Sequence, residues 1–191
     1  MGLMKEKDKK NFERIPGIKE RRIAPSNITA LDLAEAAARE LNLMGVKGII
    51  FVTQTPDYIL PFNSGMLQER LCLPKGTFAL DLTQGCSGFI YGLSVAFALT
   101  QQLGKMLLVI SETTSKIISN KDRSTSALFG DGGVACIIER SMLYSSRSEF
   151  SLYSDGSGKD VLIVPEGACR HKRTINTPIR KEQSDGSYRA A

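Results

Sequence analysis

The chain has 191 residues and a net charge of +5. Its hydrophobic fraction of 42% and charged fraction of 24% are typical of a globular protein, and its length is sufficient for one ordinary core. No apolar run is long enough to cross a bilayer and no signal peptide is recognisable, so we expect no membrane segment. The four cysteines show no pattern of a disulfide framework, which predicts a reducing, cytoplasmic location. The basic excess lies in two polar ends: residues 1–22 carry eight basic and four acidic groups, and residues 170–191 carry six and two. With few aromatic residues there, solvated arms are favoured over a nucleic-acid-binding face.

Helix and strand patterns alternate along the chain. Residues 1–14 are expected to form a poorly ordered basic arm. Thr29 is a good N-cap with Asp32 in the first turn, and apolar residues at helical spacing predict a helix that ends near Met44 and Gly45. Further elements are expected at residues 48–53 (strand), 63–71 (helix), 77–82 (strand), 88–103 (helix), and 105–111, 133–139 and 149–153 (strands). This order predicts an α/β fold in which a mixed, largely parallel sheet has helices on both faces.

The four cysteines show no CxxC spacing, which argues against a zinc site and against a disulfide framework; they are Cys72, Cys86, Cys136 and Cys169. Cys86 stands out because it follows a predicted strand and precedes a long apolar helix, with Gly85 and Gly88 beside it. The N-terminus of a helix carries a partial positive charge that stabilises a thiolate. Two interpretations stay open at this point, a reactive nucleophile and a buried structural cysteine.

Four segments occur in a recognisable order: GIKERRIA (17–24), TPDYILP (55–61), DLTQGCSGFIYGL (81–93) and DRSTSALFGDGG (122–133). In this order they resemble the β-ketoacyl-acyl-carrier-protein synthase III branch of the thiolase-like condensing enzymes. The segment around Cys86 and the FGDGG loop are the more specific parts. The resemblance spans most of residues 13–175 and implies the N-terminal half of a thiolase-like fold, with the FGDGG loop as a structural element.

The resemblance also implies a chemistry. Cys86 would take an acyl group from a coenzyme A thioester, and the carbanion formed when malonyl-acyl-carrier protein loses carbon dioxide would attack it, as in fatty acid biosynthesis. The backbone N–H of Cys86 would donate a hydrogen bond to the thioester oxygen. Coenzyme A is here part of the substrate, so neither a cofactor nor a metal is expected.

Three other positions carry over from relatives. Arg123 aligns with an arginine that meets coenzyme A phosphates, a role suited to a forked guanidinium; the alternative is a solvated loop arginine. Arg14 lies one position from the alignment of a second arginine near coenzyme A. Leu60 aligns with an apolar residue that reaches across a dimer interface into the partner's acyl pocket; the alternative is an ordinary core leucine.

The sequence departs from the family in what it lacks. Relatives are nearly twice as long, and their catalytic histidine and asparagine come from the second half. The only histidine here, His171, falls in a linker segment without a catalytic role, and the tryptophan that stacks near the adenine in relatives is absent. The part of the chain before GIKERRIA is also shorter than in relatives. We therefore expect an incomplete thiolase-like domain over residues 15–175, followed at 176–191 by a polar tail or the start of the second half.

Two functions are consistent with these features. The chain is either part of a condensing acyltransferase, with acyl-coenzyme A and acyl-carrier protein as partners, or a non-catalytic accessory subunit or degenerate fragment of one. The first requires a C-terminal half, from a separate chain or from a longer gene, and the expected protein partner is a second copy in a homodimer or that complementing half. Hydroxymethylglutaryl-coenzyme A synthase and plant-type polyketide synthases share the cysteine, but their flanking segments match less well.

Overall fold

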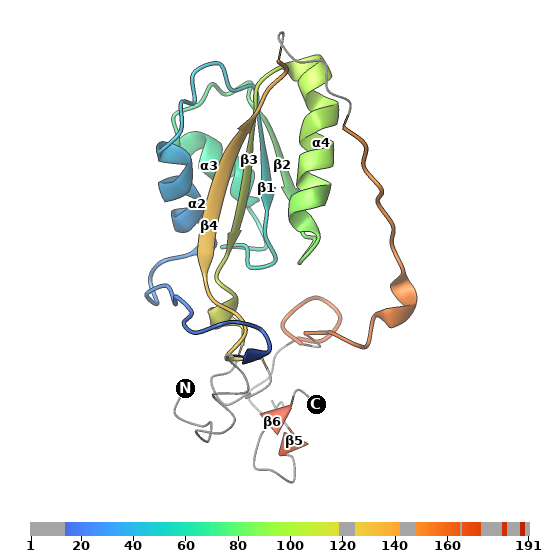
Figure 1. Cartoon of the computed structure of the whole chain (residues 1–191). Coiled ribbons are helices and arrows are strands. Elements are labelled where there is room, and N and C mark those ends of the chain that lie inside the picture. Colours follow the sequence, from blue (N-terminus) through green and yellow to red (C-terminus); the bar gives the residue numbers. More distant parts are fainter. Residues whose placement is uncertain are drawn as a thin grey trace. The chain divides into compact units, whose positions relative to one another are not determined.

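The computed structural model describes residues 14–118, 125–141, 148–164, 166–172, 181–182 and 188–189 (Figure 1). The chain forms two compact units. The larger comprises Lys19–Ile117 and Phe129–Phe150, and the smaller comprises Met1–Ile18, Ile118–Leu128 and Ser151–Ala191. Most of the expected basic arm (1–14) and of the expected tail (176–191) lies outside the described residues.

The larger unit contains a four-stranded sheet in the order β2-β1-β3-β4. The central strand β1 runs parallel to both of its neighbours, whereas β4 pairs antiparallel with β3. The predicted mixed, largely parallel sheet is therefore confirmed. Its strands are β1 (Gly48–Val52), β2 (Phe78–Leu82), β3 (Met106–Glu112) and β4 (Gly132–Ile138).

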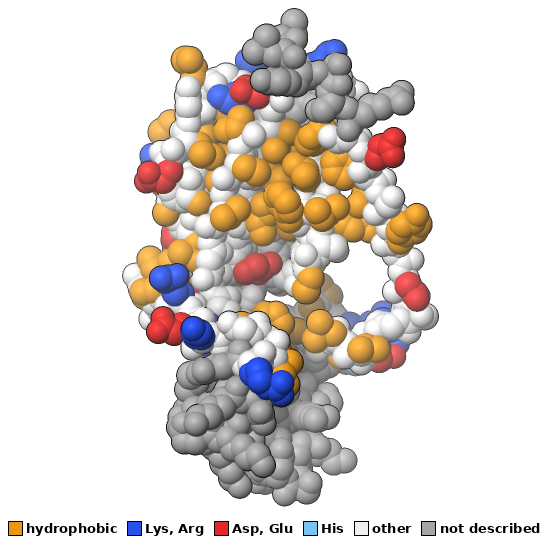
Figure 2. All heavy atoms as spheres, in the orientation of Figure 1, with side chains coloured by type: hydrophobic (Ala, Val, Ile, Leu, Met, Phe, Trp, Pro, Cys, Tyr) orange, Lys and Arg blue, Asp and Glu red, His pale blue; other side chains and the backbone are white. Residues whose placement is uncertain are grey.

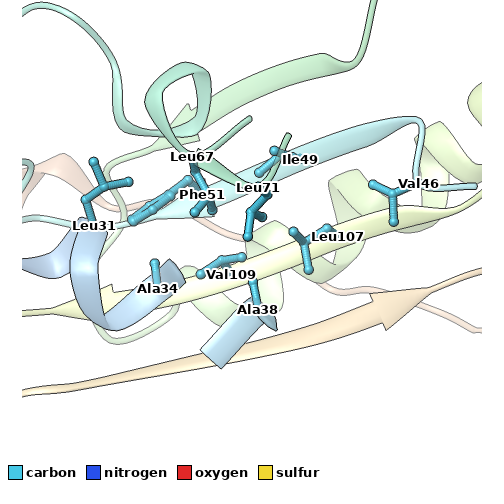
Figure 3. Packing of buried hydrophobic residues seen from close by; sticks show 10 residues of the cluster. All are labelled: Leu31, Ala34, Ala38, Val46, Ile49, Phe51, Leu67, Leu71, Leu107 and Val109. Carbon is cyan, nitrogen blue, oxygen red and sulfur yellow. The ribbon is translucent and has the colours of Figure 1, made fainter. Parts of the chain in front are cut away.

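Helices cover both faces of this sheet, as the alternating pattern predicted. Helices α2 (Ala30–Arg39) and α3 (Asn63–Arg70) lie on one face, and α4 (Gly88–Leu103) lies on the other (Figure 1). Side chains of β1 alternate between the two faces, so Ile49 and Phe51 join one core and Ile50 and Val52 join the other. Figure 3 shows the first core, where β1 and β3 pack against the two helices through ten buried residues: Leu31, Ala34, Ala38, Val46, Ile49, Phe51, Leu67, Leu71, Leu107 and Val109.

Two glycines let α4 lie directly on the sheet. A Cβ on Gly92 would lie 2.8 Å from Leu108 Cδ1 and 2.9 Å from Val52 Cγ2. One turn earlier, a Cβ on Gly88 would lie 2.5 Å from Val52 Cγ1. Both separations are far below van der Waals contact, so the short distance between α4 and strands β1 and β3 depends on these two residues.

Helix α2 is anchored at its start. Thr29 and Asp32 form a capping box, in which the Asp32 carboxylate accepts the Thr29 N–H at 2.8 Å and the Thr29 hydroxyl accepts the Asp32 N–H. The same carboxylate accepts a hydrogen bond from Arg70 Nη1 of α3 at 2.7 Å. Partial burial raises the pKa of Asp32, but the hydrogen bonds from Arg70 and Thr29 outweigh it and hold that pKa below its ordinary value. Asp32 therefore joins α2 to α3 as a carboxylate.

Two sequence predictions were wrong in detail. The helix α2 ends at Arg39 instead of continuing to Met44, because the chain then turns: Leu41 N–H donates to Ala38 O, and Gly45 takes a φ of 81° that a helix does not contain. Residues 149–153 form no strand, since no described strand pairs with them. The ring of Phe150 packs instead edge-on against Phe97 of α4, with centroids 5.5 Å apart.

The smaller unit has little regular structure among its described residues. It contains a 3₁₀ turn at Gly156–Gly158 and two short antiparallel strands, β5 (Lys181–Glu182) and β6 (Tyr188–Arg189). In the larger unit, a further 3₁₀ turn at Thr114–Lys116 follows β3.

Within the described part of the chain, none of the helices has both the length and the apolar character that crossing a membrane requires.

Apolar side chains are exposed on the larger unit. Figure 2 shows many of them gathered on the face where Figure 1 places β4 and α4. On α4 itself, Phe89, Ile90 and Phe97 remain 43%, 45% and 37% exposed. The outward side of this helix is thus more apolar than that of an ordinary surface helix.

The substitution Gly92→Val tests the close approach of α4 to the sheet. Its side chain would overlap Leu108 and Val52, and overpacking of this kind lowers the free energy of unfolding by about 1–3 kcal/mol. The matched control is Ala98→Val, which adds the same side chain at an exposed position of α4 and should stay within about 0.5 kcal/mol of wild type. Urea unfolding measures both variants, and equal stabilities would contradict the packing described here.

The substitution Asp32→Asn tests the carboxylate between α2 and α3. At pH 7 it should lower the free energy of unfolding by about 1 kcal/mol, the usual effect of weakening a helix cap. Because the folded-state pKa is lowered, this stabilisation exists above the ordinary carboxyl pKa of about 3.9 and disappears as the pH falls through the folded value. Urea unfolding at several pH values should show the difference from wild type narrowing in acid. If the difference in the free energy of unfolding did not change with pH, it would not come from the charge of Asp32. Glu40→Gln, at an exposed position, serves as the control.

Candidate active site

Cys86 lies on the turn between β2 and α4. The strand ends at Leu82 and the helix begins at Gly88, with Ser87 as its N-cap and no side-chain hydrogen bond at the cap. The Gly88 N–H donates to Gly85 O at 2.8 Å, which closes the turn around Cys86. Cys86 is exposed, so it is not a buried core cysteine. The helix N-terminus that the sequence predicted beside this sulfur is therefore present, and its partial positive charge faces the turn.

The other three cysteines have different surroundings. Cys136 lies on β4, where partial burial raises the pKa of its thiol. Cys72 is exposed but follows the C-terminus of α3, where the partial charge of a helix is negative. Cys169 is exposed in the smaller unit, and none of the described residues that follow it form a helix. Exposure next to a helix N-terminus thus distinguishes Cys86 from the other cysteines, all of which are free thiols.

A polar cluster lies where the parallel strands β1 and β3 end. Glu112, the last residue of β3, accepts a hydrogen bond from Gln54 N–H at 2.7 Å and from the Thr55 hydroxyl at 2.8 Å. The Thr55 oxygen in turn accepts the Thr113 N–H at 2.8 Å. The turn of Cys86 follows β2 at the same edge of the sheet, since carboxyl ends of parallel strands meet there.

Gln54 is next to the cysteine turn. A Cβ built on Gly85 would lie 2.7 Å from Gln54 Oε1 and 3.1 Å from both Gln54 Cδ and Nε2. The carboxamide of Gln54 therefore lies against the residue that precedes Cys86, and a side chain at position 85 would have to displace this amide. Gln54 and Glu112 were not predicted from the sequence. Their positions directly at the ends of two buried strands were the signal that could have identified them.

Two aspartates fix the segment that contains Leu60. Asp81 of β2 accepts the backbone N–H groups of Asn63 and Ser64 at 2.7 and 2.8 Å, which caps the N-terminus of α3. Asp57 accepts the Thr29 hydroxyl at 2.8 Å and the Leu31 N–H at 3.2 Å at the start of α2. The segment 57–63, which contains Leu60, is thus held at one end through Asp57 and at the other through Asp81, and both carboxylates belong to the recognised segments.

A third aspartate joins two other recognised segments. Asp131 of the FGDGG loop accepts the Ala24 N–H at 2.8 Å and the Ser115 hydroxyl at 2.6 Å, and its own N–H donates to Arg22 O at 2.8 Å. A Cβ on Gly130 would lie 3.0 Å from Arg22 O. The residues of this loop thus make contacts with neighbouring backbone, as expected of a structural element.

The structure describes three of the four site residues predicted from the sequence. Cys86 lies at the turn described above. Leu60 is 81% exposed, so the alternative of a core leucine is wrong. Arg14 is exposed and belongs to the smaller unit, and its part in coenzyme A binding stays a prediction. Arg123 lies outside the described residues. His171 is also exposed in the smaller unit, where its carbonyl accepts the Gly167 N–H.

No group of three or more potential metal ligands is found among the described residues.

Comparisons with known proteins agree with this architecture. The family described as 3-oxoacyl-[acyl-carrier-protein] synthase III matches residues 80–156, which include Cys86. A putative 3-oxoacyl-[acyl-carrier-protein] synthase 3 of Campylobacter jejuni is 38% identical over 84% of this chain and 47% of its own length. A β-ketoacyl-[acyl-carrier-protein] synthase III of Alkalilimnicola ehrlichii is 41% identical over 92% of this chain and 57% of its own length. A crystal structure of a 3-oxoacyl-(acyl-carrier-protein) synthase III superposes with a TM-score of 0.83 at 38% identity, over 91% of this chain and 54% of that one.

The sheet, its covering helices and the cysteine turn are those of a thiolase-like condensing-enzyme fold. The chain belongs to the 3-oxoacyl-acyl-carrier-protein synthase III family and spans about half the length of the curated relatives it matches.

The substitution Asp81→Asn tests the carboxylate cap of α3. An amide retains one acceptor but loses the charge and the second acceptor, and hydrogen bonds to charged groups contribute about 1.5–3 kcal/mol each. We expect a decrease in the free energy of unfolding of about 1–2 kcal/mol, measured by urea unfolding. Glu139→Gln, an exposed position after β4, should have no comparable effect. Equal stability of Asp81→Asn and wild type would show that the cap is dispensable.

Proposed function

We propose that Cys86 accepts an acyl group from an acyl-coenzyme A thioester, as the first half of a decarboxylative condensation with malonyl-acyl-carrier protein. The observation that carries this proposal is the exposed sulfur on the turn that leads into α4. Its support from known proteins is membership of a family whose described members are 3-oxoacyl-acyl-carrier-protein synthases.

In the proposed first step, Cys86 Sγ attacks the thioester carbonyl. A bond forms between Sγ and the acyl carbon, the bond from that carbon to the coenzyme A sulfur breaks, and the thiol proton leaves with coenzyme A. Negative charge develops on the carbonyl oxygen, where the backbone N–H of Cys86 and the field of the α4 N-terminus would stabilise it. The product is an acyl thioester on Cys86.

In the proposed second step, malonyl-acyl-carrier protein loses carbon dioxide and its α-carbon attacks the acyl thioester. The new carbon–carbon bond releases the sulfur of Cys86 and yields 3-oxoacyl-acyl-carrier protein. Decarboxylation requires groups that stabilise the enolate. We do not assign this role to His171, which is exposed in the smaller unit. We assign the enolate-stabilising groups to a complementing C-terminal half. In a homodimer, the exposed Leu60 would contribute to the acyl pocket of the partner.

The first half-reaction can be tested on the chain itself. We expect intact-mass spectrometry after incubation with acetyl- and octanoyl-coenzyme A to show one acyl adduct, which is absent in Cys86→Ser. The matched controls are Cys72→Ser and Cys169→Ser, which remove the other two exposed thiols and should leave the adduct unchanged.

An adduct that persists in Cys86→Ser would reject Cys86 as the acceptor. If folded wild-type chain forms no adduct at all, the proposal fails in this form, and the non-catalytic accessory function is favoured. The exposed apolar side chains of α4 would then serve packing against another subunit.

A further inference from the structure

The Gln54 carboxamide is a polar group at the cysteine turn that the proposed mechanism does not use. Gln54 follows β1 directly, and its amide atoms lie around the position that a side chain of Gly85 would occupy, at 2.7–3.1 Å. Gly85 immediately precedes Cys86. The carboxamide therefore lies one residue from the sulfur, on the backbone of the turn that carries it.

The backbone of Gln54 is held in place from a neighbouring strand. Glu112 Oε1 accepts the Gln54 N–H at 2.7 Å, while Glu112 Oε2 accepts the Thr55 hydroxyl at 2.8 Å. Thr55 is buried and also accepts the Thr113 N–H. This network connects the end of β1 to the end of β3, so the point from which the Gln54 side chain extends is rigid.

The side chain of Gln54, in contrast, is available for a ligand. Its amide group has two donor hydrogens and one acceptor oxygen. None of them is hydrogen-bonded to any other described residue, and Gln54 is exposed. An amide that lies next to a nucleophile, on a backbone that is held in place, and that has no hydrogen-bond partner among the described residues is suited to a partner that arrives with the substrate.

We propose that Gln54 is a substrate-binding residue of the Cys86 site, whose Nε2 donates a hydrogen bond to the carbonyl oxygen of the acyl group transferred to Cys86. This inference rests on the proposed acyl transfer and adds a side-chain donor to the backbone N–H of Cys86. Glu112 is a positioning residue, because its carboxylate holds the Gln54 N–H while it also accepts the Thr55 hydroxyl. The absence of a side chain at Gly85 is the third part of this arrangement, since it provides the space for the amide.

The test compares two reactions of the same sulfur in the full chain. The first is acylation by octanoyl-coenzyme A and by the octanoyl thioester of N-acetylcysteamine, which lacks the nucleotide. The second is modification by methyl methanethiosulfonate, which needs a reactive sulfur but has no carbonyl group. Intact-mass spectrometry gives the rate of each on a background of Cys72→Ser and Cys169→Ser, so that only Cys86 is exposed.

Two variants remove the proposed donor in different ways. Gln54→Leu keeps a similar size without hydrogen bonds, and Gln54→Glu keeps an acceptor without the amide donor. We expect both to slow acylation at least tenfold, since loss of one oxyanion donor typically slows an enzyme by about 10²–10³. Modification by methyl methanethiosulfonate should stay within about twofold of wild type, because the turn itself is unchanged. Gln101→Leu, an exposed glutamine near the end of α4, should alter neither rate.

Each other result is decisive. If wild type is acylated and the Gln54 variants lose less than tenfold, the inference fails while the proposed function stands. If the variants slow both reactions equally, Gln54 only supports the turn, and the inference again fails alone. If wild type reacts with methyl methanethiosulfonate but with neither thioester, the proposed function fails and this inference fails with it.

Discussion

Hydrogen bonds from backbone N–H groups to a few side-chain carboxylates hold together the loops at the edge of the sheet where the candidate site lies. Asp57, Asp81, Asp131 and Glu112 each accept at least one backbone N–H from a segment distant in the sequence. A buried or half-buried N–H without an acceptor is unfavourable, and a carboxylate offers two oxygens that can satisfy several such groups at once. These bonds decide where the loops at the carboxyl ends of the strands run.

The recognised sequence segments acquire a physical meaning from these bonds. TPDYILP provides Asp57, DLTQGCSGFIYGL provides Asp81, and the FGDGG loop provides Asp131, whose partner Ala24 belongs to GIKERRIA. Each of these recognised segments thus contains a residue that connects one part of the chain to another, and DLTQGCSGFIYGL also contains Cys86. A site assembled in this way depends on the loops as a set, because each carboxylate fixes two segments.

The helix after the cysteine has two roles that constrain each other. Its N-terminus must face Cys86, and Gly88 and Gly92 bring it against β1 and β3 so that this position is fixed. Its remaining surface is unusually apolar, with Phe89, Ile90 and Phe97 partly exposed.

The sequence by itself determined the class of fold, the strand and helix order, and the position of Cys86 between β2 and α4, because periodicity and turn residues are local properties. Only the tertiary structure decided the end of α2 at Arg39, the exposure of Leu60, and the placement of Gln54 against Gly85. Gln54 and Gly85 are 31 positions apart, and Gln54 and Glu112 are 58 apart. No local pattern encodes such pairs, since they form only when parallel strands bring their carboxyl ends to one edge of the sheet.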